Sequence, residues 1–168
     1  LSLVFARQIV KKNSVWKKNA VKVQNTLLLS LVSQAKNTKF GKDHNFSEIS
    51  NYSDWKKNIP VRDYEELKIY VQQIIEGEKD VLWPGKPLYF CKTSGTTSGT
   101  KYIPISKESM PHHITAARDA ILSYIAETKH TAIINDKMIF LQGSPEISKT
   151  GDIYTRRRKG MMAPHSTS

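Results

Sequence analysis

The apolar residues in the first part of the chain recur at helical spacing. Between residues 14 and 36 they step by three or four positions, which is the period of one helix face. The positions on this face are Trp16, Ala20, Val23, Leu27, Leu31 and Ala35. The pattern predicts one amphipathic helix over residues 14–36, with a shorter helix over residues 2–12 in front of it.

A further helix is predicted directly behind Asp63. Glu66 follows three residues later, which is the pattern of a capping box with a carboxylate in place of the usual hydroxyl. An apolar stripe of helical period comes next and stops at Gly77. We therefore interpret the sequence Arg62-Asp63-Tyr64 as the start of a helix rather than as a catalytic cluster.

From residue 88 onward the pattern is that of short strands around a loop. Residues 88–92 and 102–105 are mostly apolar or aromatic, and Pro104 places the second run at a sheet edge or strand end. Residues 138–141 are a third strand candidate, and the turn sequence Gln142-Gly143-Ser144-Pro145 follows it. Ligands of α/β proteins bind past strand ends, so this turn is a weak candidate for an acyl or nucleotide pocket beside its reading as a plain turn.

A helix is predicted between the second and third strand candidates. Ser109 can cap it, and Pro111 lies in the first turn, where a missing N–H costs little. The buried stripe expected for this helix consists of Met110, Ile114, Ala117, Ile121 and Ile125. The fold class is therefore α/β, with helices over residues 1–80 and a strand-loop-strand-helix-strand unit over residues 88–142.

Composition indicates a soluble globular chain. Of its 168 residues, 39% are hydrophobic and 24% are charged, and no apolar run approaches the roughly 20 residues of a membrane span. Cys91 is the single cysteine, which excludes an intrachain disulfide framework and favours a reducing cytoplasmic location. His112 and His113 are adjacent, so they point to different helix faces and do not form a metal pair. We assign no metal ligand and no catalytic residue from the sequence.

The net charge of +11 is concentrated at the two ends of the chain. Residues 1–42 carry nine Lys and Arg and no Asp or Glu, and residues 156–159 add four more basic residues. Such ends can bind nucleic acid or an anionic membrane, or can form a transit peptide. A solvated helix face is favoured for the first end, because Lys outnumbers Arg eight to one there. We expect residues 1–154 to form one partial subdomain and residues 155–168 to be a disordered basic tail.

The least ordinary stretch is the loop between the first two predicted strands, within "CKTSGTTSGTKY". Its glycines let the backbone approach a ligand closely, its hydroxyl groups add small donors, and a lysine ends it. These features predict a cradle for an anion, most readily a polyphosphate, in preference to a flexible linker. The residues of this cradle are Thr93, Ser94, Gly95, Thr96, Thr97, Ser98, Gly99, Thr100 and Lys101.

Two common phosphate-binding motifs do not fit the loop. A Walker A motif has four residues between its glycines, then Lys and Ser or Thr, with a helix behind. Here three residues separate Gly95 from Gly99, Thr100 precedes Lys101, and Tyr102 stands where a Ser or Thr would hold magnesium. A dinucleotide fingerprint also needs a helix after the loop, whereas a strand is predicted.

The loop resembles the phosphate loop of acyl-adenylate-forming enzymes, and its surroundings resemble one branch of them. The segments "FGKDHNF", "IPVRDYEELKIYVQQIIEGE", "WPGKPLYFCKTSGTTSGTKYIPIS" and "FLQGSPE" are similar to the N-terminal portion of the GH3 auxin-responsive promoter family. The resemblance covers roughly residues 10–147 and is closer to bacterial than to plant members.

This resemblance implies the truncated large domain of a luciferase- or acyl-CoA synthetase-like fold. Enzymes of this kind use ATP and Mg²⁺ to convert a carboxylic acid to an acyl-AMP, and then transfer the acyl group to an amino acid as an amide. The residues from Thr93 to Lys101 would contact the ATP phosphates. The later motifs for adenine, ribose and the metal, and the C-terminal lid, lie outside this sequence, so we expect an N-terminal fragment that does not complete the reaction alone.

Two alternatives remain open at this point. One is a non-enzymatic basic module that binds nucleic acid or anionic lipid through its ends, although the body of the chain is slightly acidic and no nucleic-acid motif is present. The other is an inactive truncated remnant.

Overall fold

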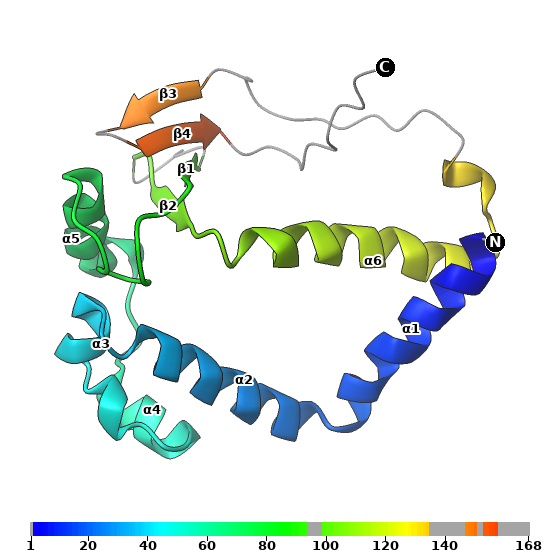
Figure 1. The fold of residues 1–168 in the computed structure, drawn as a ribbon, viewed down its shortest axis with the longest axis horizontal. Helices are drawn as coiled ribbons and strands as arrows, with labels where there is room; N and C mark the ends of the chain where they lie inside the picture. Colours follow the sequence, from blue (N-terminus) through cyan, green and yellow to red (C-terminus); the bar gives the residue numbers. More distant parts are fainter. Residues whose placement is uncertain (1, 94–98, 135–146, 151–152, 158–168) are drawn as a thin grey trace.

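The computed structural model describes residues 2–93, 99–134, 147–150 and 153–157, and the account below concerns these residues. Helices and one 3-10 helix precede the first strand: α1 (Ser2–Lys18), α2 (Ala20–Ala35), α3 (Lys39–Asp43), η1 (Phe46–Glu48), α4 (Tyr52–Asn58) and α5 (Tyr64–Ile75). The elements that follow are β1 (Tyr89–Lys92), β2 (Tyr102–Ile105), α6 (Met110–Thr128), η2 (Ala132–Ile134), β3 (Ile147–Thr150) and β4 (Ile153–Arg157). Figure 1 shows that α6 leads away from the sheet to α1, and that α2 leads back to α3 beside α5.

The prediction of one helix over residues 14–36 was wrong. The chain bends at Asn19, whose φ of −125° is not helical, so that α1 extends to Lys18 and α2 begins at Ala20. The Asn19 N–H bonds to the Trp16 carbonyl at 3.1 Å, a turn-type bond in place of the helical one. Asparagine favours such local alternatives to the helix, whereas the apolar period continued across the bend and concealed it.

The predicted capping box at the start of α5 is confirmed. Asp63 Oδ1 accepts a hydrogen bond from the Glu66 N–H, and Glu66 Oε2 accepts one from the Asp63 N–H, each at 3.0 Å. These two bonds satisfy backbone donors that the first turn leaves without partners. The first turn of α5, which contains Tyr64, is therefore firmly held.

The described strands form one sheet in the order β2-β1-β4-β3. β1 pairs antiparallel with β2 and parallel with β4, and β3 pairs antiparallel with β4. The strands predicted at residues 88–92 and 102–105 are confirmed as β1 and β2. The strand candidate at residues 138–141 lies outside the described residues.

β3 and β4 were not predicted. β4 continues to Arg157, so the predicted start of a disordered tail at residue 155 was wrong for its first three residues. Residues 155–157 pair with residues 90–92 of β1, so that Thr155 lies opposite Phe90 and Arg157 lies opposite Lys92. Hydrogen bonds to a strand more than 60 positions earlier stabilise this basic segment, and its composition gives no sign of them.

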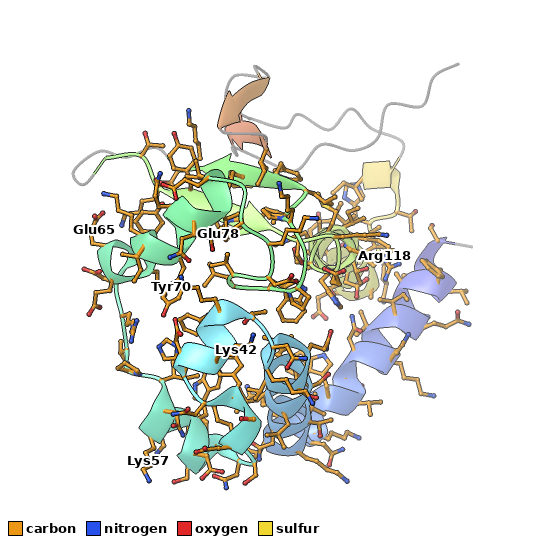
Figure 2. The ribbon with its side chains drawn as sticks, turned by 60° about the vertical axis from the view of Figure 1, so that its left-hand side comes forward. Lys42, Lys57, Glu65, Tyr70, Glu78 and Arg118 are labelled. Atoms are coloured by element: carbon orange, nitrogen blue, oxygen red, sulfur yellow. The ribbon has the colours of Figure 1, made fainter. Side chains whose placement is uncertain are left out.

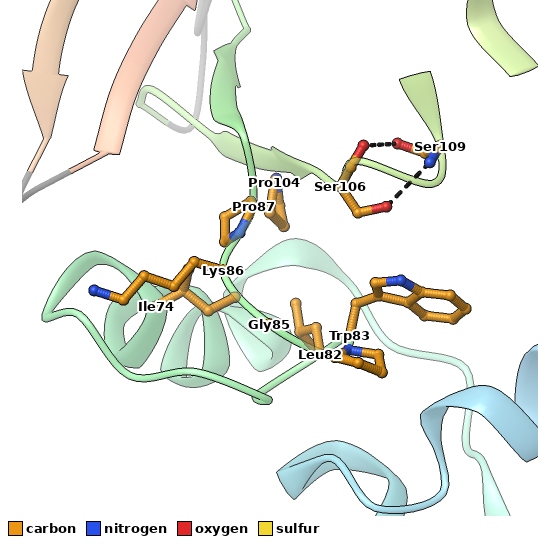
Figure 3. Close-up of a pocket in the computed structure, with 10 residues that line it drawn as sticks. Ile74, Leu82, Trp83, Gly85, Lys86, Pro87, Pro104, Ser106 and Ser109 are labelled. Carbon is orange, nitrogen blue, oxygen red and sulfur yellow. Dashed lines mark hydrogen bonds between the residues drawn. The ribbon is translucent and has the colours of Figure 1, made fainter. Parts of the chain in front are cut away.

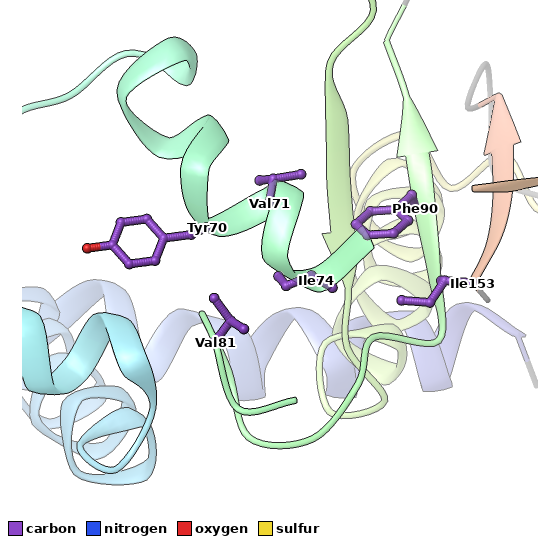
Figure 4. Close-up of a cluster of buried hydrophobic side chains, with 6 residues drawn as sticks. All are labelled: Tyr70, Val71, Ile74, Val81, Phe90 and Ile153. Carbon is purple, nitrogen blue, oxygen red and sulfur yellow. The ribbon is translucent and has the colours of Figure 1, made fainter. Parts of the chain in front are cut away.

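Helix α5 and the sheet enclose the first core cluster, shown in Figure 4. Its buried members are Tyr70, Val71, Ile74, Val81, Phe90 and Ile153. Phe90 is 0% exposed, which makes it the centre of the contact between helix and sheet. Val81 also connects this cluster to α3, because its carbonyl accepts a hydrogen bond from the Phe40 N–H at 2.9 Å.

Two smaller clusters join the remaining helices. Ala6 of α1 packs against Leu122 and Ile125 near the end of α6. The stripe predicted for α6 was therefore only partly right, since Ile125 is buried but Ile114 is 57% exposed. The last turn of α2 packs on η1 through the residues Val32, Ala35, Phe46 and Ile49.

Candidate functional site

The predicted anion loop joins the two strands of the β1–β2 hairpin. Lys92 is the last residue of β1 and pairs with Tyr102, the first residue of β2. One position further, the Thr93 N–H donates to the Lys101 carbonyl at 3.1 Å. Thr93 and Lys101 therefore stand opposite each other where the loop leaves and rejoins the sheet, and a strand, not a helix, follows Lys101 directly. This arrangement confirms that the loop connects two strands and is not a Walker A loop.

Only the two ends of the loop belong to the described residues. Thr93, Gly99 and Thr100 are exposed, and Lys101 is half-buried. The residues Ser94, Gly95, Thr96, Thr97 and Ser98 lie outside the described residues. The structure thus brings together the ends of the predicted cradle.

Gly99 has the backbone conformation that the composition of the loop suggested. Its φ is +80°, a left-handed value that residues with a side chain rarely adopt. A Cβ built at this position meets no atom within 4 Å, so the space beside the backbone is open. The chain can therefore bring a ligand close to the backbone of Gly99, as an anion-binding loop requires.

Two lysines flank the loop, and each lies over a tyrosine ring. The Lys101 Nζ is 5.5 Å from the centroid of the Tyr64 ring, and the Lys92 Nζ is 5.4 Å from that of Tyr102. Among the described residues the ion pairs are Lys68–Glu65 and Arg118–Asp119, so neither loop lysine is paired with a carboxylate in that part of the chain. Each end of the loop therefore carries one lysine charge without a carboxylate partner among the described residues.

Sequence reasoning missed Lys92. The signal was present, because a cation stands immediately before the hydroxyl-rich run as well as after it. The antiparallel register pairs Lys92 with Tyr102, the residue that follows Lys101, so both lysines lie where the loop joins the sheet.

A separate pocket lies at the other end of β2, shown in Figure 3. Its volume is about 230 Å³, and it is lined mainly by Ile74, Leu82, Trp83, Pro84, Pro87 and Pro104. Ser106 and Ser109 at its rim bond to each other, through the Ser109 N–H to Ser106 Oγ at 3.1 Å and the Ser109 Oγ to the Ser106 carbonyl at 3.0 Å. The Trp83 Nε1 donates to Glu108 at 3.0 Å, so the pocket offers mostly apolar surface. The turn predicted as a pocket candidate, residues 142–145, lies outside the described residues.

Shifted pKa values occur away from the loop. Burial, together with a hydrogen bond to Asp43 at 2.9 Å, raises the pKa of Tyr70. Figure 2 shows Tyr70 between α5 and the helices below it. In the described part of the chain, no three His, Cys, Asp or Glu side chains gather as metal ligands do, and no helix is long and apolar enough to cross a membrane.

Comparison with known proteins identifies relatives over most of the chain. The sequence profile of the GH3 family N-terminal domain matches residues 10–162. Two proteins of Arabidopsis thaliana are similar: indole-3-acetic acid-amido synthetase GH3.15, with 29% identity over 98 residues, and probable indole-3-acetic acid-amido synthetase GH3.1, with 30% identity over 95 residues. The matches cover 57% and 55% of this chain, and 16% of each relative.

Solved structures share the fold. The AtGH3.15 acyl acid amido synthetase in complex with 2,4-DB matches with a TM-score of 0.77 and 21% identity, over 90% of this chain. A second structure, the GH3.15 acyl acid amido synthetase, matches with a TM-score of 0.70 and 23% identity, over 86% of this chain. The chain spans 27% of each solved relative, so the mixed helix-and-sheet fold corresponds to the N-terminal part of those proteins.

Proposed function

Because the chain belongs to the GH3 family, we propose that it forms the phosphate-binding N-terminal part of an ATP-dependent acyl acid amido synthetase. The observation that carries this proposal is the loop between β1 and β2, with left-handed Gly99 and Lys101 at its exit. The chain spans only 16% of its curated relatives, so adenine, ribose and lid contacts belong to segments beyond those matched here. The chain alone binds ATP through its phosphates and does not complete the amide synthesis.

The charges at the loop suit this role. Adenylation brings an anionic carboxylate to the α-phosphate of ATP, so positive charge and N–H donors must offset the repulsion between the two. Lys101 and Lys92 supply the charge, and the open backbone at Gly99 supplies room for close approach. An ionised carboxylate is already a nucleophile, so the loop region needs no general base.

Magnesium would enter the site together with ATP. Mg²⁺ at nucleotide sites keeps several waters and needs one or two carboxylates besides the phosphates. The described residues offer no cluster of three acidic, histidine or cysteine ligands. We therefore place the metal on the phosphates and assign it no ligand among these residues.

Calorimetry with tripolyphosphate, ATP and adenosine tests the proposal. Lys101→Ala should weaken tripolyphosphate binding about ten- to hundredfold, because a hydrogen bond to a charged group contributes about 1.5–3 kcal/mol. ATP and tripolyphosphate should bind with similar affinity, and adenosine should not bind detectably.

Lys57→Ala is the matched control, since it removes the same charge from α4, away from the sheet (Figure 2). It should change the affinity by less than about twofold at high salt, where diffuse attraction to the basic ends is screened. Equal affinities of the two variants would remove the loop from the site and favour the inactive remnant.

A further inference from the structure

Tyr64 contacts the exit of the loop both through its hydroxyl and through its ring. Its hydroxyl accepts the Tyr102 N–H at 2.8 Å, across 38 positions of sequence. Its ring lies under the Lys101 ammonium, with 5.5 Å between Nζ and the ring centroid. One side chain of α5 therefore holds the backbone of Tyr102 and the charged group of the residue before it.

The hairpin geometry explains why this backbone N–H is available. In an antiparallel pair the hydrogen-bonded positions alternate with positions whose N–H points outward. Thr93 and Lys101 form a hydrogen-bonded position, so the outward positions of β2 are Tyr102 and Pro104. β2 lies at the edge of the sheet, and proline has no N–H. Tyr64 thus supplies the partner for the outward N–H of this edge strand at the loop.

Tyr64 is itself rigidly placed. It is the first residue of α5, directly behind the capping box at Asp63. It also packs against the first core cluster, in which Tyr70 and Ile74 of the same helix are buried. A side chain fixed by helix start and core can hold the otherwise flexible Lys101 stem in one orientation.

We propose that Tyr64 is a positioning residue that holds Lys101 in place for binding phosphate. The inference rests on the proposed phosphate-binding role of the loop and adds the residue that orders its cation. A phosphate then binds a lysine whose side-chain freedom is already restricted, and this preorganisation raises affinity without any contact between Tyr64 and the ligand.

Two substitutions separate the contacts of Tyr64 in the full chain. Tyr64→Phe removes the hydroxyl and keeps the ring, so tripolyphosphate binding should weaken about two- to tenfold, the range that one neutral hydrogen bond gives. Tyr64→Leu removes both contacts and should weaken binding about tenfold or more. Tyr70→Phe is the matched control. It removes a hydroxyl from the same helix as Tyr64, but this hydroxyl bonds to Asp43 of α3, so the affinity should be unchanged.

A readout at Lys101 distinguishes positioning from general stability. The NMR signals of the Lys101 Hε protons should show an upfield ring-current shift in the parent and in Tyr64→Phe, and lose it in Tyr64→Leu. In a Lys101→Ala background, Tyr64→Leu should cause no further loss of tripolyphosphate affinity, since its effect acts through Lys101.

The possible outcomes separate this inference from the proposed function. If Lys101→Ala weakens binding but both Tyr64 variants bind like the parent, the positioning role is wrong and the phosphate loop stands. If Lys101→Ala itself binds like the parent, both are overturned. Should Tyr64→Leu fail to fold, Tyr64→Phe decides: an unchanged affinity, or an unshifted Lys101 signal in the parent, contradicts the proposal.

Discussion

The junction between α5 and the hairpin and the arm formed by α1 and α2 differ in how their apolar residues are covered. In α5 the stripe residues Tyr70, Val71 and Ile74 are each at most 5% exposed, because the sheet and residue 81 pack against them. In the arm, Val21 is 73% exposed and Leu27 is 57% exposed. The apolar residues of α5 and of the arm both recur at helical spacing, but among the described residues only those of α5 are largely covered by other side chains.

The difference shows that periodicity identifies the apolar face of a helix and not what covers it. Most of the residues expected on the buried face of the 14–36 helix are instead exposed by more than a third of their surface: Trp16, Val23, Leu27 and Leu31. The arm meets the rest of the fold chiefly at its two ends, through Ala6 on α6 and Val32 on η1. Substitutions in the two regions should therefore have unequal consequences.

The largest difference between the two regions is expected when one phenylalanine in each is replaced by alanine. Phe90→Ala should lower the free energy of unfolding by about 3–5 kcal/mol, because a fully buried ring leaves a cavity between α5 and the sheet. Phe5→Ala on α1, where the ring is 46% exposed, should cost less than about 1 kcal/mol. Urea unfolding followed by circular dichroism measures both, and equal losses would mean that the arm is packed as tightly as the junction.

What could be predicted from the sequence follows the same division. The start of α5 was predictable because the capping box uses residues three positions apart, and the hairpin strands because each is a short apolar run. β4 was not, because its pairing with β1 spans more than 60 positions and its own residues are largely polar or basic. The bend at Asn19 was hidden by an apolar period that continues through it.

The candidate site shows the same limit. The position of the loop between two strands was predictable, and its composition predicts an anion site. Tyr64 was not predictable, because it approaches Lys101 and Tyr102 only through the packing of α5 beside β2. The hydrogen bond between Tyr64 and Tyr102 joins residues 38 positions apart, and such a contact produces no periodic pattern in a single sequence.

A smaller effect is expected at the N-terminal caps of α5 and α2. Asp63→Ala should lower the free energy of unfolding by about 1 kcal/mol, because it removes a capping side chain with a defined backbone partner. Asn19, at the same place before α2, makes no capping bond through its side chain, so Asn19→Ala should change stability by less than about 0.5 kcal/mol. Asp63→Asn retains an acceptor and should recover most of the loss, and the opposite ranking of the two alanine variants would contradict the comparison.

The smallest effect is expected at the polar contact that ties the arm to α6. Asn13 Nδ2 of α1 donates to Asp119 Oδ2 at 2.8 Å, and Arg118 donates to the other oxygen. The Asn13 bond, followed by those from Arg118, lowers the pKa of Asp119 from its ordinary value of 3.8. A carboxyl whose folded pKa is lowered contributes stability that is present above the unfolded value and is lost as the pH falls through the folded one. The tie between α1 and α6 should therefore weaken below about pH 4.

Carboxyl NMR titration of the parent and of Asn13→Ala tests this tie directly. The substitution should raise the pKa of Asp119 toward 3.8, because the largest stabilising contact of the ionised form is gone. Ser14→Ala is the control on the same helix, since its hydroxyl bonds only to the Lys11 carbonyl and should leave Asp119 unchanged. Asp54, whose pKa is lowered mainly by hydrogen bonds from Ser50, should titrate identically in all three chains. If Asn13→Ala leaves the Asp119 titration unmoved, the arm does not hold α6 through this bond, and its attachment rests on the apolar contact around Ala6 alone.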